Sequence, residues 1–200
     1  MFRHINNSGI AISASIASIA FAGLDLTPYH DAIELGDAVI QRVHFCDGDK
    51  KFAVTISSDT EILGGTNRAV FRFKTISLAE MSLCQSTINP SIPFSPENLP
   101  GYKSVARKQL GAAAEIVAEA EPEFDVLPIN GWKSCRFTFT TKHPGLVFKT
   151  EVTFLNLNSE QQIMIVTTSK EADFPDVRAR AHKMMSRWHE VLPGDEAGLN

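Results

Sequence analysis

The feature that most constrains this chain is a set of three closely spaced strand-like runs between residues 134 and 169. In the first run, residues 134–140, a cysteine and two phenylalanines alternate with polar side chains. Successive side chains of an extended chain point to opposite faces, so Cys135, Phe137 and Phe139 share one face. Strands this close in sequence pair through tight turns, and the runs therefore predict an antiparallel sheet.

The other two runs fit the same sheet. Residues 146–157 alternate between apolar and polar side chains, and the sequence Lys-His-Pro-Gly at 142–145 predicts a hairpin turn before them. The third run, residues 161–169, is apolar on both faces at 163–166, which is typical of a fully covered strand. We therefore expect this last strand to be buried on both faces.

Strand-like runs also occur earlier in the chain. Residues 51–57 alternate as a half-buried strand should, and residues 68–78 repeat the pattern. Residues 79–87 are expected to continue the sheet. Glycine and aspartate at 46–51, and two glycines with an asparagine at 64–67, predict the turns that precede the first two runs.

Residues 102–121 are rich in alanine, leucine, glutamate and lysine, and they predict a long helix that ends at Pro122. Gly111 weakens this helix by roughly 1 kcal/mol relative to alanine. Four prolines mark residues 90–100 as a surface loop. The period of residues 27–45 is ambiguous between a helix and a pair of strands, and both remain open.

The closing segment, residues 172–192, predicts a second helix with Asp173 at its N-cap and Pro175 in its first turn. The apolar side chains that recur on one face are Phe174, Val177, Ala181, Met184 and Trp188. The basic side chains expected to lie largely on the solvent side are Arg178, Arg180, Lys183 and Arg187. Strands and helices in this order predict an α+β fold, an antiparallel sheet flanked by helices.

The chain divides into four parts. Residues 1–22 have a weakly positive start, a short apolar run and a small-x-small site ending at Ala22, which predicts a signal peptide. An ordinary element of the fold, or an extension from a misplaced start codon, is the alternative. Residues 23–49 form an N-terminal segment of uncertain structure, residues 50–192 the α+β domain, and residues 193–200 a flexible tail.

Composition excludes some partners. The 200 residues carry a net charge of -4 and 44% hydrophobic residues, as in an ordinary soluble globular protein. A sequence pI near 5.9 argues against a broad phosphate-binding surface, so we expect no nucleic acid partner. The apolar run at the N-terminus is short and diluted by serines, so we expect no stable membrane span after signal removal.

The cysteines allow one disulfide. An oxidising compartment would permit one bond among three cysteines, and Cys46 with Cys84 is the candidate pair if Cys135 is buried on its strand. Three free thiols are the equal alternative, since sequence separation does not determine the Cα distance. Cys135 itself is expected to be a small buried hydrophobe, because it shares a face with phenylalanines.

No metal or cofactor motif is present, and we expect neither. His182 and His189 are seven residues apart, which on one helix is about 10 Å along the axis and too far for a shared zinc ion. The remaining histidines considered, His30, His44 and His143, are expected on the surface. The sequence contains no Cys-x-x-Cys, no Gly-x-Ser-x-Gly and no phosphate-binding glycine loop.

Three stretches, INGWKSCRFTFT, QQIMIVTTSKEADF and RARAHKMMSRW, resemble the PsbP-like group, which includes DcrB-like lipoproteins and a Ran-binding import factor. The matching features are Gly131 at a turn, the strand from Ile163 to Ser169, the Asp173-Phe174 step and Trp188. The resemblance covers about residues 50–192. It implies an α/β/α sandwich and a non-enzymatic accessory or binding domain, commonly exported in bacteria.

These observations favour a non-enzymatic exported protein, periplasmic or secreted, that holds an unknown partner protein or small ligand at a sheet edge or in a groove between sheet and helix. The alternative is a cytoplasmic adaptor that binds a GTPase or another protein. A minor alternative is a thiol hydrolase with Cys135 as nucleophile and His143 as base.

Overall fold

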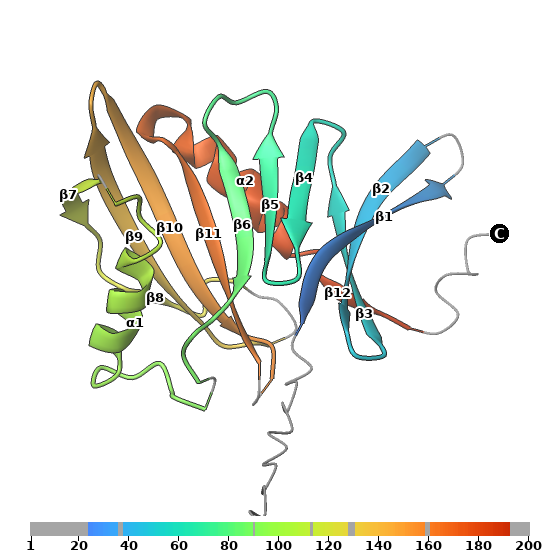
Figure 1. Ribbon diagram of the computed structural model, residues 1–200, viewed down its shortest axis with the longest axis horizontal. Helices are drawn as coiled ribbons and strands as arrows, with labels where there is room; N and C mark the ends of the chain where they lie inside the picture. Colours follow the sequence, from blue (N-terminus) through green and yellow to red (C-terminus); the bar gives the residue numbers. More distant parts are fainter. Residues whose placement is uncertain are drawn as a thin grey trace, which may run out of the picture.

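A computed structural model describes residues 24–35, 38–89, 91–112, 114–127, 131–158 and 161–192. The predicted signal peptide and the predicted tail lie outside these residues. The described chain folds into two antiparallel sheets and two short helices, which confirms the α+β class (Figure 1).

The larger sheet has eight strands. Its order is β4-β5-β6-β11-β10-β9-β7, and β8 pairs with β9 beside this path. The strands are β4 (Thr60–Gly65), β5 (Arg68–Phe73), β6 (Glu80–Gln85), β7 (Glu115–Glu119), β8 (Glu123–Phe124), β9 (Ser134–His143), β10 (Leu146–Asn156) and β11 (Gln162–Lys170). The three predicted C-terminal strands are adjacent and antiparallel, and the predicted hairpin pairs His143 with Leu146.

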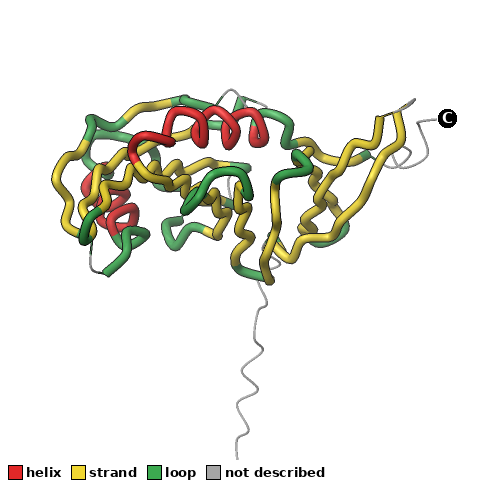
Figure 2. Tube along the Cα trace, turned by 90° about the horizontal axis from the view of Figure 1, so that it is seen from above, coloured by secondary structure: helices red, strands yellow, loops and turns green. Residues whose placement is uncertain are grey.

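The smaller sheet combines both ends of the described chain. Its order is β1 (Asp25–Leu35), β2 (Ala38–Asp47), β3 (Lys50–Ile56) and β12 (His189–Val191). The described part of residues 27–45, whose sequence period fits either a helix or a pair of strands, therefore belongs to a pair of strands. The far part of this pair projects from the body of the molecule, and we call it the β1–β2 arm (Figures 1 and 2).

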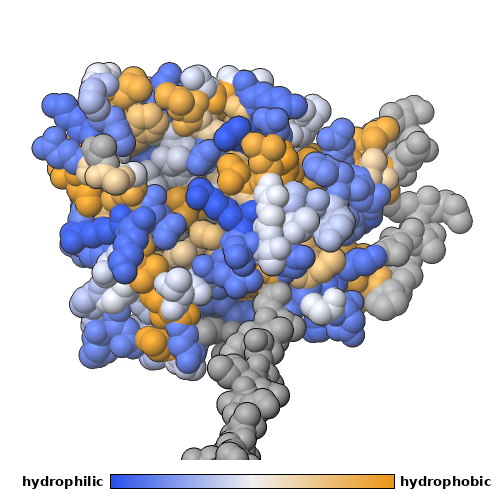
Figure 3. Space-filling model, in the orientation of Figure 1, coloured by the Kyte–Doolittle hydropathy of each residue, from blue (hydrophilic) through white to orange (hydrophobic). Residues whose placement is uncertain are grey.

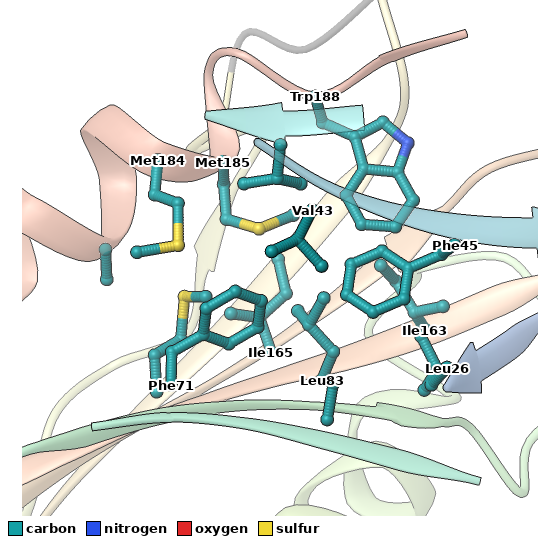
Figure 4. Packing of buried hydrophobic residues seen from close by; sticks show 14 of the residues in the cluster. Leu26, Val43, Phe45, Phe71, Leu83, Ile163, Ile165, Met184, Met185 and Trp188 are labelled. Atoms are coloured by element: carbon teal, nitrogen blue, oxygen red, sulfur yellow. The ribbon is translucent and has the colours of Figure 1, made fainter. Parts of the chain in front are cut away.

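One hydrophobic cluster joins the two sheets on the side of α2 (Phe174–Met185). Trp188 stacks on Phe45 of β2 and on Phe52 of β3, with ring centroids 5.6 and 5.7 Å apart. Figure 4 shows this indole above a layer that contains Met185 of the helix and Ile163 of β11. The first residues of the fold and the indole just before its last strand thus share one core with the large sheet.

The predicted second helix is correct at its start and too long at its end. All five side chains predicted for its apolar face are buried. The helix, however, ends at Met185, and His189 begins β12. Trp188 fills the space between two rings of the small sheet, and that position requires the chain to leave the helix and pair with β3.

The predicted helix over residues 102–121 is correct only in its first part. Helix α1 (Leu99–Arg107) packs Tyr102 and Ala106 against the opposite face of the large sheet. Residues 115–119 instead form β7, which pairs with β9. Strand pairing with β9 overrides the helix propensity of residues 115–119, so α1 is shorter than predicted. Helices α1 and α2 are both short and lie on opposite faces of the large sheet (Figure 2).

Candidate functional site

The structure separates the two residues of the thiol hypothesis. Cys135 and His143 lie eight residues apart on the single strand β9, which is roughly 26 Å at the rise of an antiparallel strand. Cys135 is fully buried against Phe137 and Phe154, and burial raises the pKa of its thiol to about 12. A protonated thiol this far from a base cannot act as the predicted nucleophile.

All three cysteines are free thiols. Cys46 lies on β2 of the small sheet, whereas Cys84 lies on β6 of the large sheet, where its thiol donates to the carbonyl oxygen of Met164 at 3.7 Å. The candidate bond between Cys46 and Cys84 is therefore not formed in this structure. Burial raises the pKa of the Cys84 thiol, which favours its protonated form.

The histidines that the structure describes have separate surroundings. His44 is buried rather than on the surface, and its Nε2 atom lies 3.0 Å from Oδ2 of Asp31. His182 lies on α2, with Nε2 3.0 Å from Oε1 of Glu151, whereas His189 lies on β12. The described residues contain no group of three histidine, cysteine, aspartate or glutamate side chains arranged for a metal ion.

A buried carboxylate connects the large sheet to α2. Glu151 of β10 is almost fully buried, and its Oε2 atom lies 3.2 Å from Arg136 of β9 and 2.9 Å from Arg178 of α2. Arg136 is also buried and pairs with Glu123 at 2.5 Å. These charges compensate one another, so we assign this cluster to the stability of the fold.

The basic run of α2 is not simply a solvent-facing surface. Arg178 pairs with the buried Glu151, and Arg180 pairs with Asp59 at 2.6 Å and with Asp176 at 3.2 Å. Lys183 and Arg187, which come next along the run, line hollows in the surface. All four side chains therefore reach solvent, but the first two also form ion pairs, with 39% of the Arg178 side chain and 35% of the Arg180 side chain exposed.

These hollows form the candidate site. A cleft of about 880 Å³ lies between the β1–β2 arm, the end of β3 and the connection from α2 to β12. Its lining residues are Val39, Ile40, Gln41, Thr55, Ile56, Ser57, Ser58, Ser186, Arg187, Trp188 and His189. A hollow of about 260 Å³ adjoins it through Thr55, Ile56, Ser57 and Arg187, and adds Asp59, Phe73, Arg180, Lys183 and Met184. We call the two together the α2 groove.

The α2 groove combines two kinds of surface. Val39 of the arm, which is 63% exposed, contributes the apolar surface, and the largely buried Ile56 and Trp188 also belong to the lining. Serine hydroxyls and the exposed side chains of Lys183 and Arg187 supply polar and cationic surface. This combination suits a ligand that presents both apolar and hydrogen-bonding groups.

A network of hydrogen bonds fixes one end of the groove. Asp59 accepts hydrogen bonds from the hydroxyls of Ser57 and Thr75, the latter at 2.9 Å, and also pairs with Arg180. These partners, the Ser57 hydroxyl foremost, lower the pKa of Asp59, so the carboxylate stays ionised. The turn after β3 is thereby held against α2.

The face opposite to α2 has a different character. Figure 3 shows that hydrophobic residues on this face, which carries α1, form several separate patches among hydrophilic ones. One further hollow of about 410 Å³ lies beside α1, between Pro100 and Lys108. Its lining comes from α1 and the residue that follows it, whereas three parts of the chain converge on the α2 groove.

Comparisons with known proteins give only distant likenesses. No family model and no curated protein matches the chain. A protein of unknown function from Pseudomonas aeruginosa, PA94, described as a putative regulator, has 13% identity and a TM-score of 0.42, over 82% of this chain and 97% of that one. LpqN of Mycobacterium tuberculosis, involved in cell envelope biogenesis, has 9% identity and a TM-score of 0.44, over 83% and 92%.

The structure adds that none of the helices in its described part is both long and apolar enough to cross a membrane.

Proposed function

We propose that this chain is a non-enzymatic, exported accessory protein that holds a segment of a partner protein in the α2 groove. The observation that carries the proposal is the convergence of the β1–β2 arm, the end of β3 and the end of α2 around one cleft. A cleft built by several elements is a common form of ligand site. The separation of Cys135 from His143 supports a role in binding rather than in thiol chemistry.

The β1–β2 arm supports a protein partner in particular. A two-stranded ribbon is marginally stable in water unless another element covers it. The arm projects from the body and leaves Tyr29 and Val39 more than half exposed. A polypeptide lying in the groove would cover Val39 and extend the contact along the arm, whereas a small ligand would leave most of the arm bare.

The PsbP-like sandwich and the export of the chain are part of the same proposal. The placement of α1 and α2 on opposite faces of the large sheet supports the sandwich. Export rests on the predicted signal at residues 1–22, which lies outside the described residues. The intact mass of protein from separate cell fractions tests it: loss of residues 1–22 in an exported fraction is expected, and full-length protein confined to the cytosol would contradict it.

Site-specific photo-crosslinking tests the groove. A photoreactive amino acid at Val39 is expected to capture one discrete partner protein in cells. The same amino acid at Leu63 is the control, because Leu63 is also exposed but lies on β4, away from the groove. Adducts of equal yield from both positions would contradict the proposal.

The captured partner is then purified and its affinity measured by calorimetry. Ser58→Trp places a large side chain in the groove and is expected to weaken binding by about tenfold or more, since a filled groove excludes the partner. Ser91→Trp is the matched control, because Ser91 is an exposed loop residue outside the groove. Unchanged affinity of the Ser58 variant would place the partner elsewhere.

A further inference from the structure

We infer that the partner segment is acidic and extended, with carboxylate side chains that meet Lys183 and Arg187 at the rim of the α2 groove. This inference rests on the proposed function and names the chemistry of the occupant.

The first observation is that these two cations are not compensated. In the part of the chain that the structure describes, no carboxylate lies within ion-pair distance of Lys183 or Arg187. The nearby acidic side chains are already engaged, since Asp59 and Asp176 pair with Arg180. The rim therefore presents positive charge that the fold does not use.

The second observation is where these cations point. On an ordinary solvent-facing helix surface, unpaired cations are common and need no partner. Lys183 and Arg187 instead line the groove together with Thr55 and Ser57 of the β3 end, and Ser186 lies beside them. The hydroxyls of Ser57 and Ser186 donate to Asp59 and to the carbonyl oxygen of Lys183, so the donors at this rim are the two cations and the Thr55 hydroxyl. Cationic N–H groups suit a carboxylate, which accepts several hydrogen bonds at once.

The third observation concerns shape. β12 pairs only with Lys51–Ala53 of β3, whereas β3 continues to Ile56 along the floor of the groove. An occupant of the groove thus lies near a strand and meets apolar surface at Val39 as well as the cations Lys183 and Arg187. An extended segment alternates its side chains between two faces, so it can offer apolar groups on one face and carboxylates on the other.

The net charge of the whole chain shows which groups would attract an acidic ligand. The net charge is -4, so the overall field does not attract an acidic ligand. The attraction must therefore come from Lys183 and Arg187 at short range. Binding must also weaken as the salt concentration rises. Above an ionic strength of about 0.15 M the Debye length falls below about 8 Å, and binding of an acidic segment weakens.

Fluorescence anisotropy with two synthetic peptides tests the inference. The first peptide alternates glutamate with valine, and the second replaces every glutamate with glutamine while keeping the same shape. We expect the glutamate peptide to bind the full chain at least about tenfold more tightly at low salt, because only its side chains carry charge. Equal affinities would overturn the inference.

Charge reversal on the protein provides the second arm. The double variant Lys183→Glu/Arg187→Glu is expected to lose at least about tenfold in affinity for the glutamate peptide, because repulsion replaces attraction. The matched control, Arg72→Glu/Lys108→Glu, changes the net charge equally. Both control residues are exposed and lie away from the groove, Arg72 on β5 and Lys108 after α1. An equal loss in the control would overturn the inference.

The outcomes separate this inference from the proposed function. If both peptides bind equally and Ser58→Trp abolishes both, the groove holds a segment but the acidic chemistry is wrong. If neither peptide binds while the crosslinked partner still depends on Ser58, the inference fails and the proposed function stands. If peptide and partner both ignore Ser58→Trp, the two fail together. Circular dichroism of each variant establishes that it remains folded.

Discussion

At the scale of single residues, the most costly group in the fold is the carboxylate of Glu151. Its side chain is buried between the guanidinium groups of Arg136 and Arg178, and Arg136 is buried as well. Buried ion pairs contribute little net stability, but removing one partner leaves a charge without water or a counter-ion. The loss of stability on removing one member of the pair therefore depends on whether the remaining charge is buried.

We expect Glu151→Ala to lower the free energy of unfolding by about 3–5 kcal/mol, because Arg136 is left buried with only Glu123 as counter-ion. Urea unfolding measures the change. Glu123→Ala is the control: Glu123 is exposed, so water can replace it and a loss within about 1 kcal/mol is expected. Similar losses in the two variants would show that burial does not determine the cost.

Asp31 makes the stability of the small sheet depend on pH. Hydrogen bonds from Arg42, chiefly, and from His44 hold the pKa of Asp31 at about 2, below the usual 3.8. A lowered folded-state pKa stabilises the native state above the unfolded-state value, and this stabilisation disappears as the pH falls through the folded value. The stabilising effect is therefore complete above about pH 4 and lost towards pH 2.

The variant Asp31→Asn is expected to be less stable than the parent chain near neutral pH, and the difference should shrink between about pH 4 and pH 2. Urea unfolding of both proteins across this pH range measures it. Asp31 is partly exposed, so the effect is moderated by solvent. A difference that stays constant over the whole range would contradict the role of the carboxylate.

At the scale of elements, the sequence predicts strands where side chains alternate and fails where tertiary pairing decides. The alternation of Cys135, Phe137 and Phe139 correctly predicts a strand with one buried face. Residues 115–119 carry no such signal, since β7 is exposed along most of its length and has helix-forming neighbours. The sequence does not predict strand β4, because its last residues, Gly64 and Gly65, are typical of a turn.

The candidate site shows the same limit. The basic residues of the closing segment are visible in the sequence, but their pattern predicts only a solvent-facing helix surface. What distinguishes Lys183 and Arg187 is their position beside Ile56 and Val39, which lie more than a hundred residues earlier. No local pattern in the sequence predicts that these residues lie close together. The turn from α2 into β12 brings them together.

Trp188 is the residue that holds this turn in place. Replacing it with alanine is expected to cost about 3–5 kcal/mol, because the side chain fills the space between Phe45 and Phe52. Trp188→Phe should cost clearly less, since a ring remains and the buried indole N–H, which has no partner among the described residues, is removed. Urea unfolding compares the two variants, and equal costs would contradict this packing.

At the scale of the whole molecule, the two sheets share one hydrophobic cluster, which runs from Leu24 and Phe45 to Ile163 and Trp188. A backbone hydrogen bond of 3.0 Å from Leu26 to Thr66 links β1 to the turn after β4. The sheets are therefore expected to unfold together. Tryptophan fluorescence and far-ultraviolet circular dichroism should give the same urea midpoint, and an earlier fluorescence transition would contradict this.

The closing of the small sheet by β12 has a consequence for biosynthesis. β1, β2 and β3 leave the ribosome first, but the strand that completes their sheet and the indole that fills their core are encoded near residue 190. Until translation is nearly finished, Phe52 and Phe45 lack the indole that stacks on them, although Phe45 can already contact Phe71 of β5. Contacts of such long sequence separation form slowly. The small sheet is therefore expected to be completed only after the end of the chain has been made.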